Sequence, residues 1–197
     1  MAYSGWNVPA CPVAREIEQY WTESFPSGQN VMANVYYDPH FVGFNNQNFD
    51  SHPQGDAILF KNSLLNFEIH ARHKPVNQTV RPSVIDAIAV KVKSDIIEYH
   101  VDQGTFLLNG KSPEFRSNWT YCPNSMTSIV MENGHEFHIY AEFGPRLTVR
   151  NCGCYNLNAR LTLPRAHAQN AEASLFGNLT GKHAQIIPAT GLFSSSR

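Results

Sequence analysis

The sequence predicts a mainly β fold, an antiparallel β-sandwich of two packed sheets with a short N-terminal helix. Short apolar runs rich in β-branched and aromatic residues recur along the chain, which is the composition that strands prefer. The 12 glycines and 12 prolines fall between these runs as turn residues. With 197 residues, of which 42% are apolar, the chain can bury one large core, so we expect a single β domain.

The first expected element is the helix. Residues 13–21 place apolar side chains at helical spacing, and the Pro26-Ser27-Gly28 run that follows ends the pattern. We therefore divide the chain into an N-terminal extension with a short helix (1–30), a β domain (31–190) and a frayed tail (191–197).

Strands follow from residue 31 onward as short runs bounded by Asp, Asn, Pro and Gly. The expected strands cover residues 34–37, 57–60, 65–71, 84–92, 96–101, 105–108, 128–131, 136–140, 147–150 and 158–163. The fourth and fifth should form a hairpin, because only a short polar turn at residues 93–95 separates them. Regularly spaced short strands are typical of a sandwich or barrel.

Composition excludes several kinds of partner. The 15 basic and 16 acidic residues give a net charge of −1, which provides no positive field for a nucleic acid. No run approaches the roughly 20 apolar residues of a membrane-spanning helix. The first residues lack the basic and apolar regions of a secretory signal, so the beginning of the sequence does not reveal the location.

Four cysteines, an even number, are compatible with two disulfides in an oxidising compartment. We expect Cys152 and Cys154 to pair with Cys11 and Cys122, in an order that the sequence leaves open. A redox or metal role for Cys152 and Cys154 is the alternative, but their one-residue spacer lacks the usual CxxC form.

Three sequons offer glycosylation candidates at Asn77, Asn118 and Asn178. Together with the cysteine count they favour a secreted or extracellular protein.

Several segments, taken in order, carry a family resemblance. Residues 37–46 read Tyr-Asp-Pro-His-Phe-Val-Gly-Phe-Asn-Asn, and the further matching stretches are residues 54–60, 83–90, 108–110, 157–164 and 175–181. Their order and spacing resemble the von Willebrand factor type D family, over about residues 31 to 187. Members are β-rich extracellular modules of mucins, clotting-factor carriers, yolk proteins and gel-forming coats. The resemblance implies a structural or binding module.

The resemblance also implies a calcium site, because in the family an early turn and the closing loop approach each other and commonly hold calcium. The matching positions here are Asn45, Asn178 and Thr180, and the family's acidic pair is replaced by residues around Ala184 and Gln185. Calcium prefers about 6 to 8 oxygen ligands with some anionic charge. We therefore expect at most a weak calcium site.

Cysteines that many members carry are absent too, since Phe176 stands at one of their positions. The chain therefore resembles the cysteine-poor branch of the family, and disulfide-linked multimer assembly is not carried over.

Two histidine pairs are candidates for metal or catalytic sites. His70 and His73 lie three apart on an expected strand and so face opposite sides, and we expect both to be solvated surface histidines. His135 and His138 flank an expected turn at Asn133-Gly134, with a carboxylate at Glu136 between them. Zinc hydrolases place such ligands on a helix, which disfavours a zinc site on this hairpin.

The sequence favours a binding module that mediates protein or glycan contacts in an adhesive, coat or matrix setting, and disfavours an enzyme. No Gly-x-Ser-x-Gly nucleophile elbow is present. The alternatives are a metal-dependent enzyme or oxidase component, and a lipid or ligand carrier with a large apolar cavity. The identity of the partner and the oligomeric state stay open.

Overall fold

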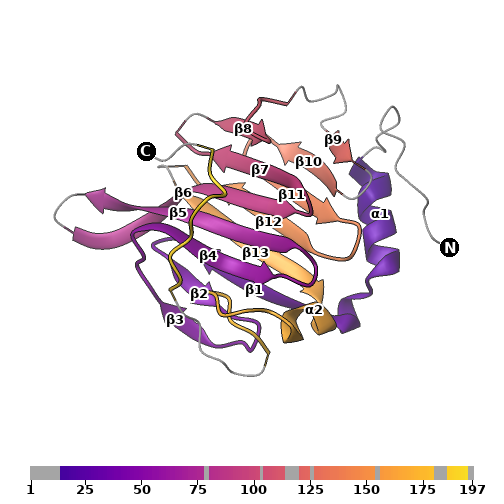
Figure 1. The fold of residues 1–197 in the computed structure, drawn as a ribbon, viewed down its shortest axis with the longest axis horizontal. Helices are drawn as coiled ribbons and strands as arrows, with labels where there is room; N and C mark the ends of the chain where they lie inside the picture. Colours follow the sequence, from indigo (N-terminus) through magenta and orange to yellow (C-terminus); the bar gives the residue numbers. More distant parts are fainter. Residues whose placement is uncertain are drawn as a thin grey trace.

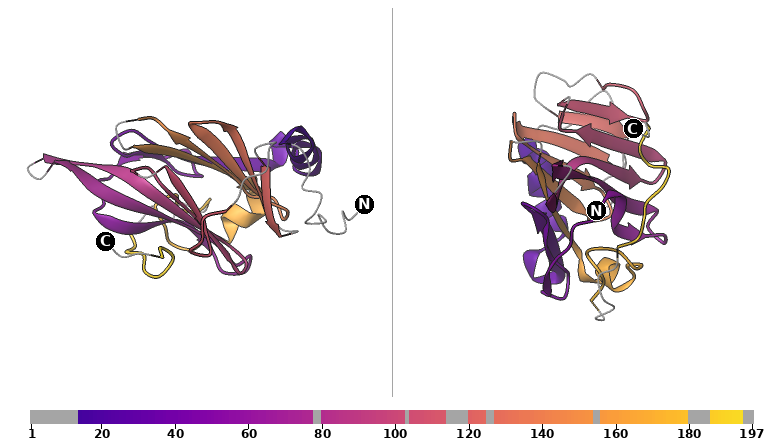
Figure 2. Two further views of the ribbon diagram at one scale, coloured as in Figure 1. Left: turned by 90° about the horizontal axis from the view of Figure 1, so that it is seen from above. Right: turned by 90° about the vertical axis from the view of Figure 1, so that its left-hand side faces the viewer.

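The computed structural model describes residues 14–77, 80–102, 104–113, 120–124, 127–153, 156–179 and 186–194. Its strands form two antiparallel sheets that face each other as a sandwich (Figures 1 and 2). The predicted mainly β sandwich with a short N-terminal helix is confirmed.

The larger sheet, sheet A, has the strand order β3, β2, β1, β13, β12, β11, β10, β9. Its strands are β1 (Asn30–Tyr36), β2 (His40–Val42), β3 (Asn48–Asp50), β9 (Thr120–Asn124), β10 (Thr127–Asn133), β11 (Glu136–Ala141), β12 (Arg146–Asn151) and β13 (Leu157–Pro164). Sheet B has its strands in sequential order: β4 (Gly55–Asn62), β5 (Phe67–Asn77), β6 (Val80–Val92), β7 (Asp95–His100) and β8 (Thr105–Leu108).

The core lies between the sheets and follows from the two-residue period of a strand. On β13, Leu157, Ala159, Leu161 and Leu163 are buried and alternate with less buried neighbours. The buried side chains of both sheets form one continuous cluster. Each fully buried leucine or isoleucine contributes roughly 1.5 to 3 kcal/mol, so this alternation holds the sheets together. The intervening positions on sheet A point outward and are free for another role.

All ten predicted strands are present, together with the predicted hairpin between β6 and β7. The short strands β2, β3 and β9 and the helix α2 (Arg165–Gln169) were not predicted. Strands of three to five residues carry too little alternation to be recognised in a sequence.

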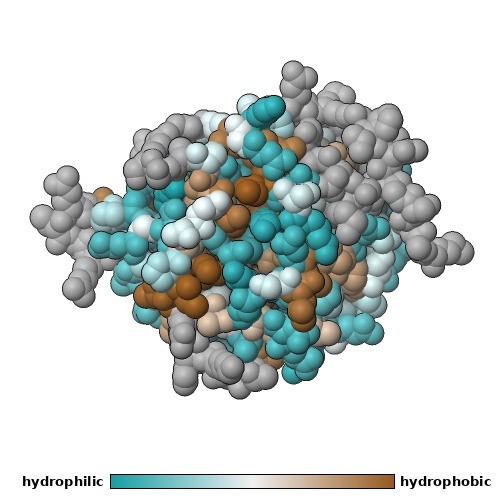
Figure 3. Space-filling model, viewed as in Figure 1, coloured by the Kyte–Doolittle hydropathy of each residue, from teal (hydrophilic) through white to brown (hydrophobic). Residues whose placement is uncertain are grey.

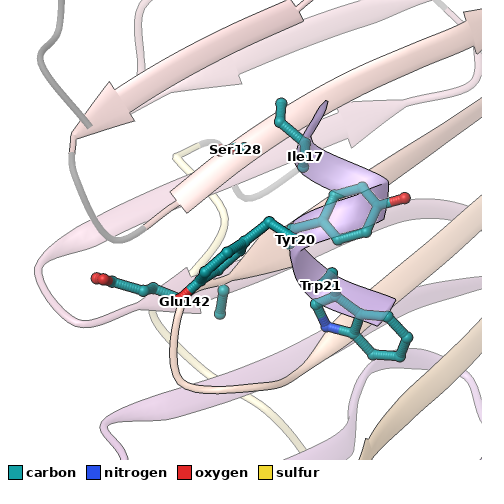
Figure 4. A pocket seen from close by; sticks show the side chains of 7 residues that line it. Ile17, Tyr20, Trp21, Ser128 and Glu142 are labelled. Atoms are coloured by element: carbon teal, nitrogen blue, oxygen red, sulfur yellow. The ribbon is translucent and has the colours of Figure 1, made fainter. Parts of the chain in front are cut away.

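The helix α1 (Ala14–Ser24) packs on the outer face of sheet A, so the N-terminal extension is partly integrated into the sandwich. Ile17 and Trp21 form a small apolar cluster with Val130 and Tyr140. The Trp21 indole N–H donates a hydrogen bond of 2.8 Å to the carbonyl of Gly144. Figure 4 shows Ile17 and Trp21 over the strand, and the hollow between them measures about 10 Å³, too small for a ligand.

Residues 186–194 cross over sheet B as an extended segment, drawn in yellow in Figure 1. The amide of Ile58 donates to the carbonyl of Ile187 at 3.0 Å, and the amide of Ala189 donates to the carbonyl of Asp56 at 2.9 Å. Leu192 is buried as well. Of the expected tail, Phe193 and Ser194 contact side chains of sheet B, and residues 195–197 lie outside the described residues.

Hydrophilic and hydrophobic side chains are intermixed on the face that this segment crosses (Figure 3). Among the described residues, no helix combines the length and the apolar character needed to span a membrane.

Candidate functional site

Outward-facing side chains on the central strands of sheet A form a polar surface with hollows, which we call the sheet A face. Its members are Asn34, Tyr36, Glu132, Glu136, His138, Thr148, Arg150, Asn158 and Arg160. The strand register places Asn34, Arg160, Thr148 and His138 side by side across four strands. Because alternate positions on each strand point inward to the core, these polar side chains all emerge on the same side.

Two adjoining hollows of about 430 and 510 Å³ lie over this face. They share Glu136, Thr148 and Arg160, so together they form one trough across the strands. Each hollow has the size of a typical small-molecule site, roughly 300 to 1,000 Å³. The trough differs from the large apolar cavity expected of a lipid carrier, because charged side chains such as Glu136 and Arg160 line both hollows.

Charges of both signs line the trough. Arg146 forms an ion pair of 3.3 Å with Glu18 of α1 and lies 5.2 Å above the Tyr140 ring. The Arg160 side chain donates to Asn34 at 3.1 Å and keeps its other N–H groups available for a ligand. The arrangement offers fixed donors and acceptors to a ligand with many polar groups.

One corner of the trough brings together Glu132, Glu136 and His138, whose ligand atoms lie within 4.8 Å of one another. His138 is 5% exposed, and its Nε2 lies 2.8 Å from a Glu132 oxygen and 3.8 Å from a Glu136 oxygen. Its Nδ1 is 3.0 Å from the Thr148 hydroxyl, which fixes the ring. The hydrogen bond with His138 lowers the pKa of Glu132.

His135 is exposed at the turn and does not belong to this group with His138. The hairpin between β10 and β11 is confirmed, with Gly134 and His135 as its turn residues in place of Asn133-Gly134. Glu132 was missed in the sequence. Glu132 occupies a β-bulge between Met131 and Asn133. A bulge changes the direction of a side chain, and no pattern in this sequence marks its position.

His70 and His73 are each only 2% exposed, so the prediction of solvated surface histidines is wrong. The reason is that β5 lies between β4 and β6 in sheet B, with the core of the sandwich on one face of the sheet and residues 186–194 across the other. Burial lowers the pKa of His70, although Glu68 lies 2.5 Å away. Burial also lowers the pKa of His73 to about 4. The two rings, three residues apart on a strand, lie on opposite faces as expected.

The Asp38-Pro39-His40 motif forms the turn into β2. His40 lies between Asp50 at 2.6 Å and Asp38 at 3.3 Å, and the hydrogen bond with Asp50 raises the pKa of His40. The Asp38 carboxylate is half exposed and contacts the His40 ring at this turn.

The calcium candidates lie on two segments that do meet. The amide of Phe44 donates to the carbonyl of Phe176 at 3.2 Å, which joins the turn at Asn45 to the loop at Asn178. A side chain at Gly43 would approach the Phe176 carbonyl to 3.0 Å, so glycine permits this contact. Thr180 lies outside the described residues.

The chemistry at this junction suits calcium poorly. The Asn45 carboxamide oxygen accepts the Gln47 amide at 3.1 Å, and Asn178 is 8% exposed. A hollow of about 540 Å³ beside Asn45 is lined by Arg165 and, among the described residues, by no carboxylate. Calcium sites use anionic oxygen ligands, so this hollow offers an unfavourable charge.

Cys152 is an exposed free thiol, so the expected bridge of this cysteine is wrong, whereas Cys122 is disulfide-bonded as expected. Cys152 follows β12, and β11 and β10 separate that strand from Cys122 in β9. Strands about 4.8 Å apart place these positions roughly 14 Å from each other, beyond the ~7 Å between Cα atoms that a disulfide allows. Cys122 is buried, while Cys11 and Cys154 lie outside the described residues. With Cys152 free, at most one bridge can form within the chain.

The sequons have different surroundings. Asn77 ends β5, and Asn118 lies outside the described residues. Asn178 is 8% exposed, which leaves no room for a glycan on its side chain in the folded chain. Glycosylation at Asn77 and Asn118 stays a prediction.

No protein-family model matches the chain, and no curated protein matches it.

Proposed function

We propose that the protein is a binding module that holds a short oligosaccharide in the trough of the sheet A face. The observation that carries the proposal is the row of outward amide, guanidinium, hydroxyl and carboxylate groups beneath two joined hollows.

An oligosaccharide suits this face for two chemical reasons. Each sugar hydroxyl both donates and accepts, and Asn34, Asn158, Arg160 and Glu136 present donors and acceptors within one trough. Sugars also have apolar C–H faces that stack on aromatic rings. Tyr36 lines one end of the trough and is 36% exposed, so it can provide such a ring.

The wider assignment is an extracellular module similar to the von Willebrand factor type D family, working in an adhesive, coat or matrix setting. The contact between Phe44 and Phe176 supports it, because the early turn and the late loop of the resembling span lie together. Extracellular location rests on the sequons and on this resemblance. In the alternative version of this proposal, the sheet A face binds a protein instead of a glycan.

The test is binding of a glycan panel, followed by titration calorimetry of the best ligand with single variants. Arg160→Gln should weaken binding about tenfold or more, since a hydrogen bond from a charged donor contributes roughly 1.5 to 3 kcal/mol. Arg165→Gln, which changes an exposed arginine outside the trough, is the matched control. Glycan binding that Arg160→Gln leaves unchanged would remove the sheet A face from the proposal.

A metal-dependent enzyme is the second candidate, favoured by the group of Glu132, Glu136 and His138. One imidazole and two carboxylates are ligands that first-row transition metals accept, with positions left for water. Zinc titration tests it: binding at one ion per chain that His138→Ala removes and His135→Ala keeps would favour the enzyme. Binding insensitive to His138→Ala would exclude this group.

A further inference from the structure

A second, covered groove lies on the outer face of sheet B. Its floor is formed by Ala87 and Ala89 of β6, both buried, and the inward residues of the same strand include Ile88 and Val90. Its walls, placed by the strand register, are His70 and Arg72 on β5 and Glu98 and His100 on β7. Short alanines between longer side chains make a trough along β6, which we call the alanine trough.

The chain's own residues 193 and 194 fill the alanine trough. The Arg72 guanidinium lies 4.2 Å from the Phe193 ring centroid, and the His100 ring lies 5.9 Å from it. The amide and the hydroxyl of Ser194 both donate to one Glu98 oxygen, at 3.1 and 3.2 Å. Glu98 is 1% exposed, and the same oxygen lies 3.1 Å from His100 Nε2.

The upstream part of the segment binds the first half of the outer edge of β4, and residues 172–176 bind the second half. Pro188 forms a bridge with Ala57, flanked by the two backbone hydrogen bonds of Ile58 and Ala189. Edge hydrogen bonds together with a side-chain pocket are how proteins recognise extended peptides. The segment itself contains no regular secondary structure, so its position depends on these contacts.

Removal of residues 193 and 194 from the alanine trough would destabilise the fold. Glu98 would lose two hydrogen bonds in a buried position, and the floor of Ala87 and Ala89 would be exposed. Any chain that releases its segment therefore gains from binding an identical one, which is the physical basis of segment exchange between copies.

We propose that the alanine trough is a docking site for residues 186–194 of a second copy of this chain, taken up in exchange for the trough's own segment. Reciprocal exchange closes a dimer, and one-directional exchange links copies into chains. This inference does not depend on the ligand of the sheet A face.

The first experiment measures peptide binding to the full chain. A fluorescent peptide of residues 186–194, Ile-Ile-Pro-Ala-Thr-Gly-Leu-Phe-Ser, is titrated into a full-length Phe193→Ala variant, whose own segment is weakened. We expect one peptide per chain, bound at least tenfold more tightly than by the wild type, where the native segment competes. A peptide with alanine in place of its Phe is the control and should bind at least tenfold more weakly. Ser194→Ala serves as a milder host if Phe193→Ala does not fold.

The second experiment measures exchange itself. Two wild-type preparations with different tags are mixed at high concentration, and mixed species are captured through one tag and detected through the other. Mixed oligomers that excess peptide suppresses, and that Glu98→Gln reduces, are expected. Failure of folded host variants to bind the peptide would overturn the docking site. Peptide binding without mixed oligomers would overturn exchange and leave only an intramolecular contact.

Discussion

The outer faces of the two sheets carry the same kinds of residue but use them differently. On the sheet A face, Arg160 and Glu136 project over open hollows. On sheet B, Glu98 and His100 are 1% and 6% exposed beneath residues 186–194. The same fold therefore has one open polar face and one polar face that a segment of the chain covers.

The difference shows that burial sets the role of a polar side chain. Exposed pairs contribute about 0 to 1 kcal/mol and can exchange protein partners for a ligand. Removing a buried hydrogen-bond acceptor leaves its partner groups unsatisfied, at roughly 1 to 3 kcal/mol each, so such a group is fixed in place. The open face is suited to binding external molecules, and the closed face to holding a segment of the chain.

The largest expected effect separates the two faces by stability. Glu98→Ala should lower the free energy of unfolding by about 3 kcal/mol, because His100 and Ser194 lose a buried hydrogen-bond acceptor. Glu136→Ala on the sheet A face is the matched control and should cost less than about 1 kcal/mol. Urea unfolding of both variants measures the difference, and equal losses would contradict the comparison.

Acid should destabilise the fold through sheet B. The folded pKa of His73, about 4, is below the ordinary value of 6.5, so protonation favours the unfolded chain. The stability from neutral His73 is complete above pH 6.5 and is lost as pH falls toward 4, by up to about 3 kcal/mol. Urea unfolding at pH 7 and 4.5 should show this loss, and His73→Gln should reduce it. An unchanged pH dependence in His73→Gln would exclude this residue as the cause.

A smaller effect is expected at the aromatic end of the sheet A face. Tyr36→Ala should weaken oligosaccharide binding by about 1 kcal/mol, roughly fivefold, because a stacking ring is lost. Tyr20→Ala, on α1 outside the trough, should leave affinity unchanged. Titration calorimetry compares them, and equal weakening would point to a general loss of fold.

The smallest expected effect concerns Cys152. Since it is exposed and free, Cys152→Ser should change unfolding free energy by less than about 0.5 kcal/mol. Thiol counting in denaturant without reductant should find at least two thiols in the wild type, one of which this variant removes. A count of zero would show that two bridges form after all.

Alternation of apolar and polar residues was sufficient to predict the sandwich and its longer strands, because burial on one face imposes that period. The pattern of Leu157, Ala159, Leu161 and Leu163 is an example. The site was less predictable. Nothing local marks the bulge that turns Glu132 toward His138, and nothing local indicates that Phe193 meets Arg72. Sequence periodicity does not predict contacts between distant segments, because the order of the strands sets these contacts.

The most direct test of the open-and-closed comparison is an NMR titration of the isotope-labelled protein with the best-binding oligosaccharide. We predict that chemical-shift changes concentrate at Asn34, Thr148 and Arg160 on the sheet A face, while residues 186–194 and the alanine trough stay unchanged. Changes concentrated on sheet B, or at the turn of Asn45, would contradict the assignment of the sheet A face as the binding surface.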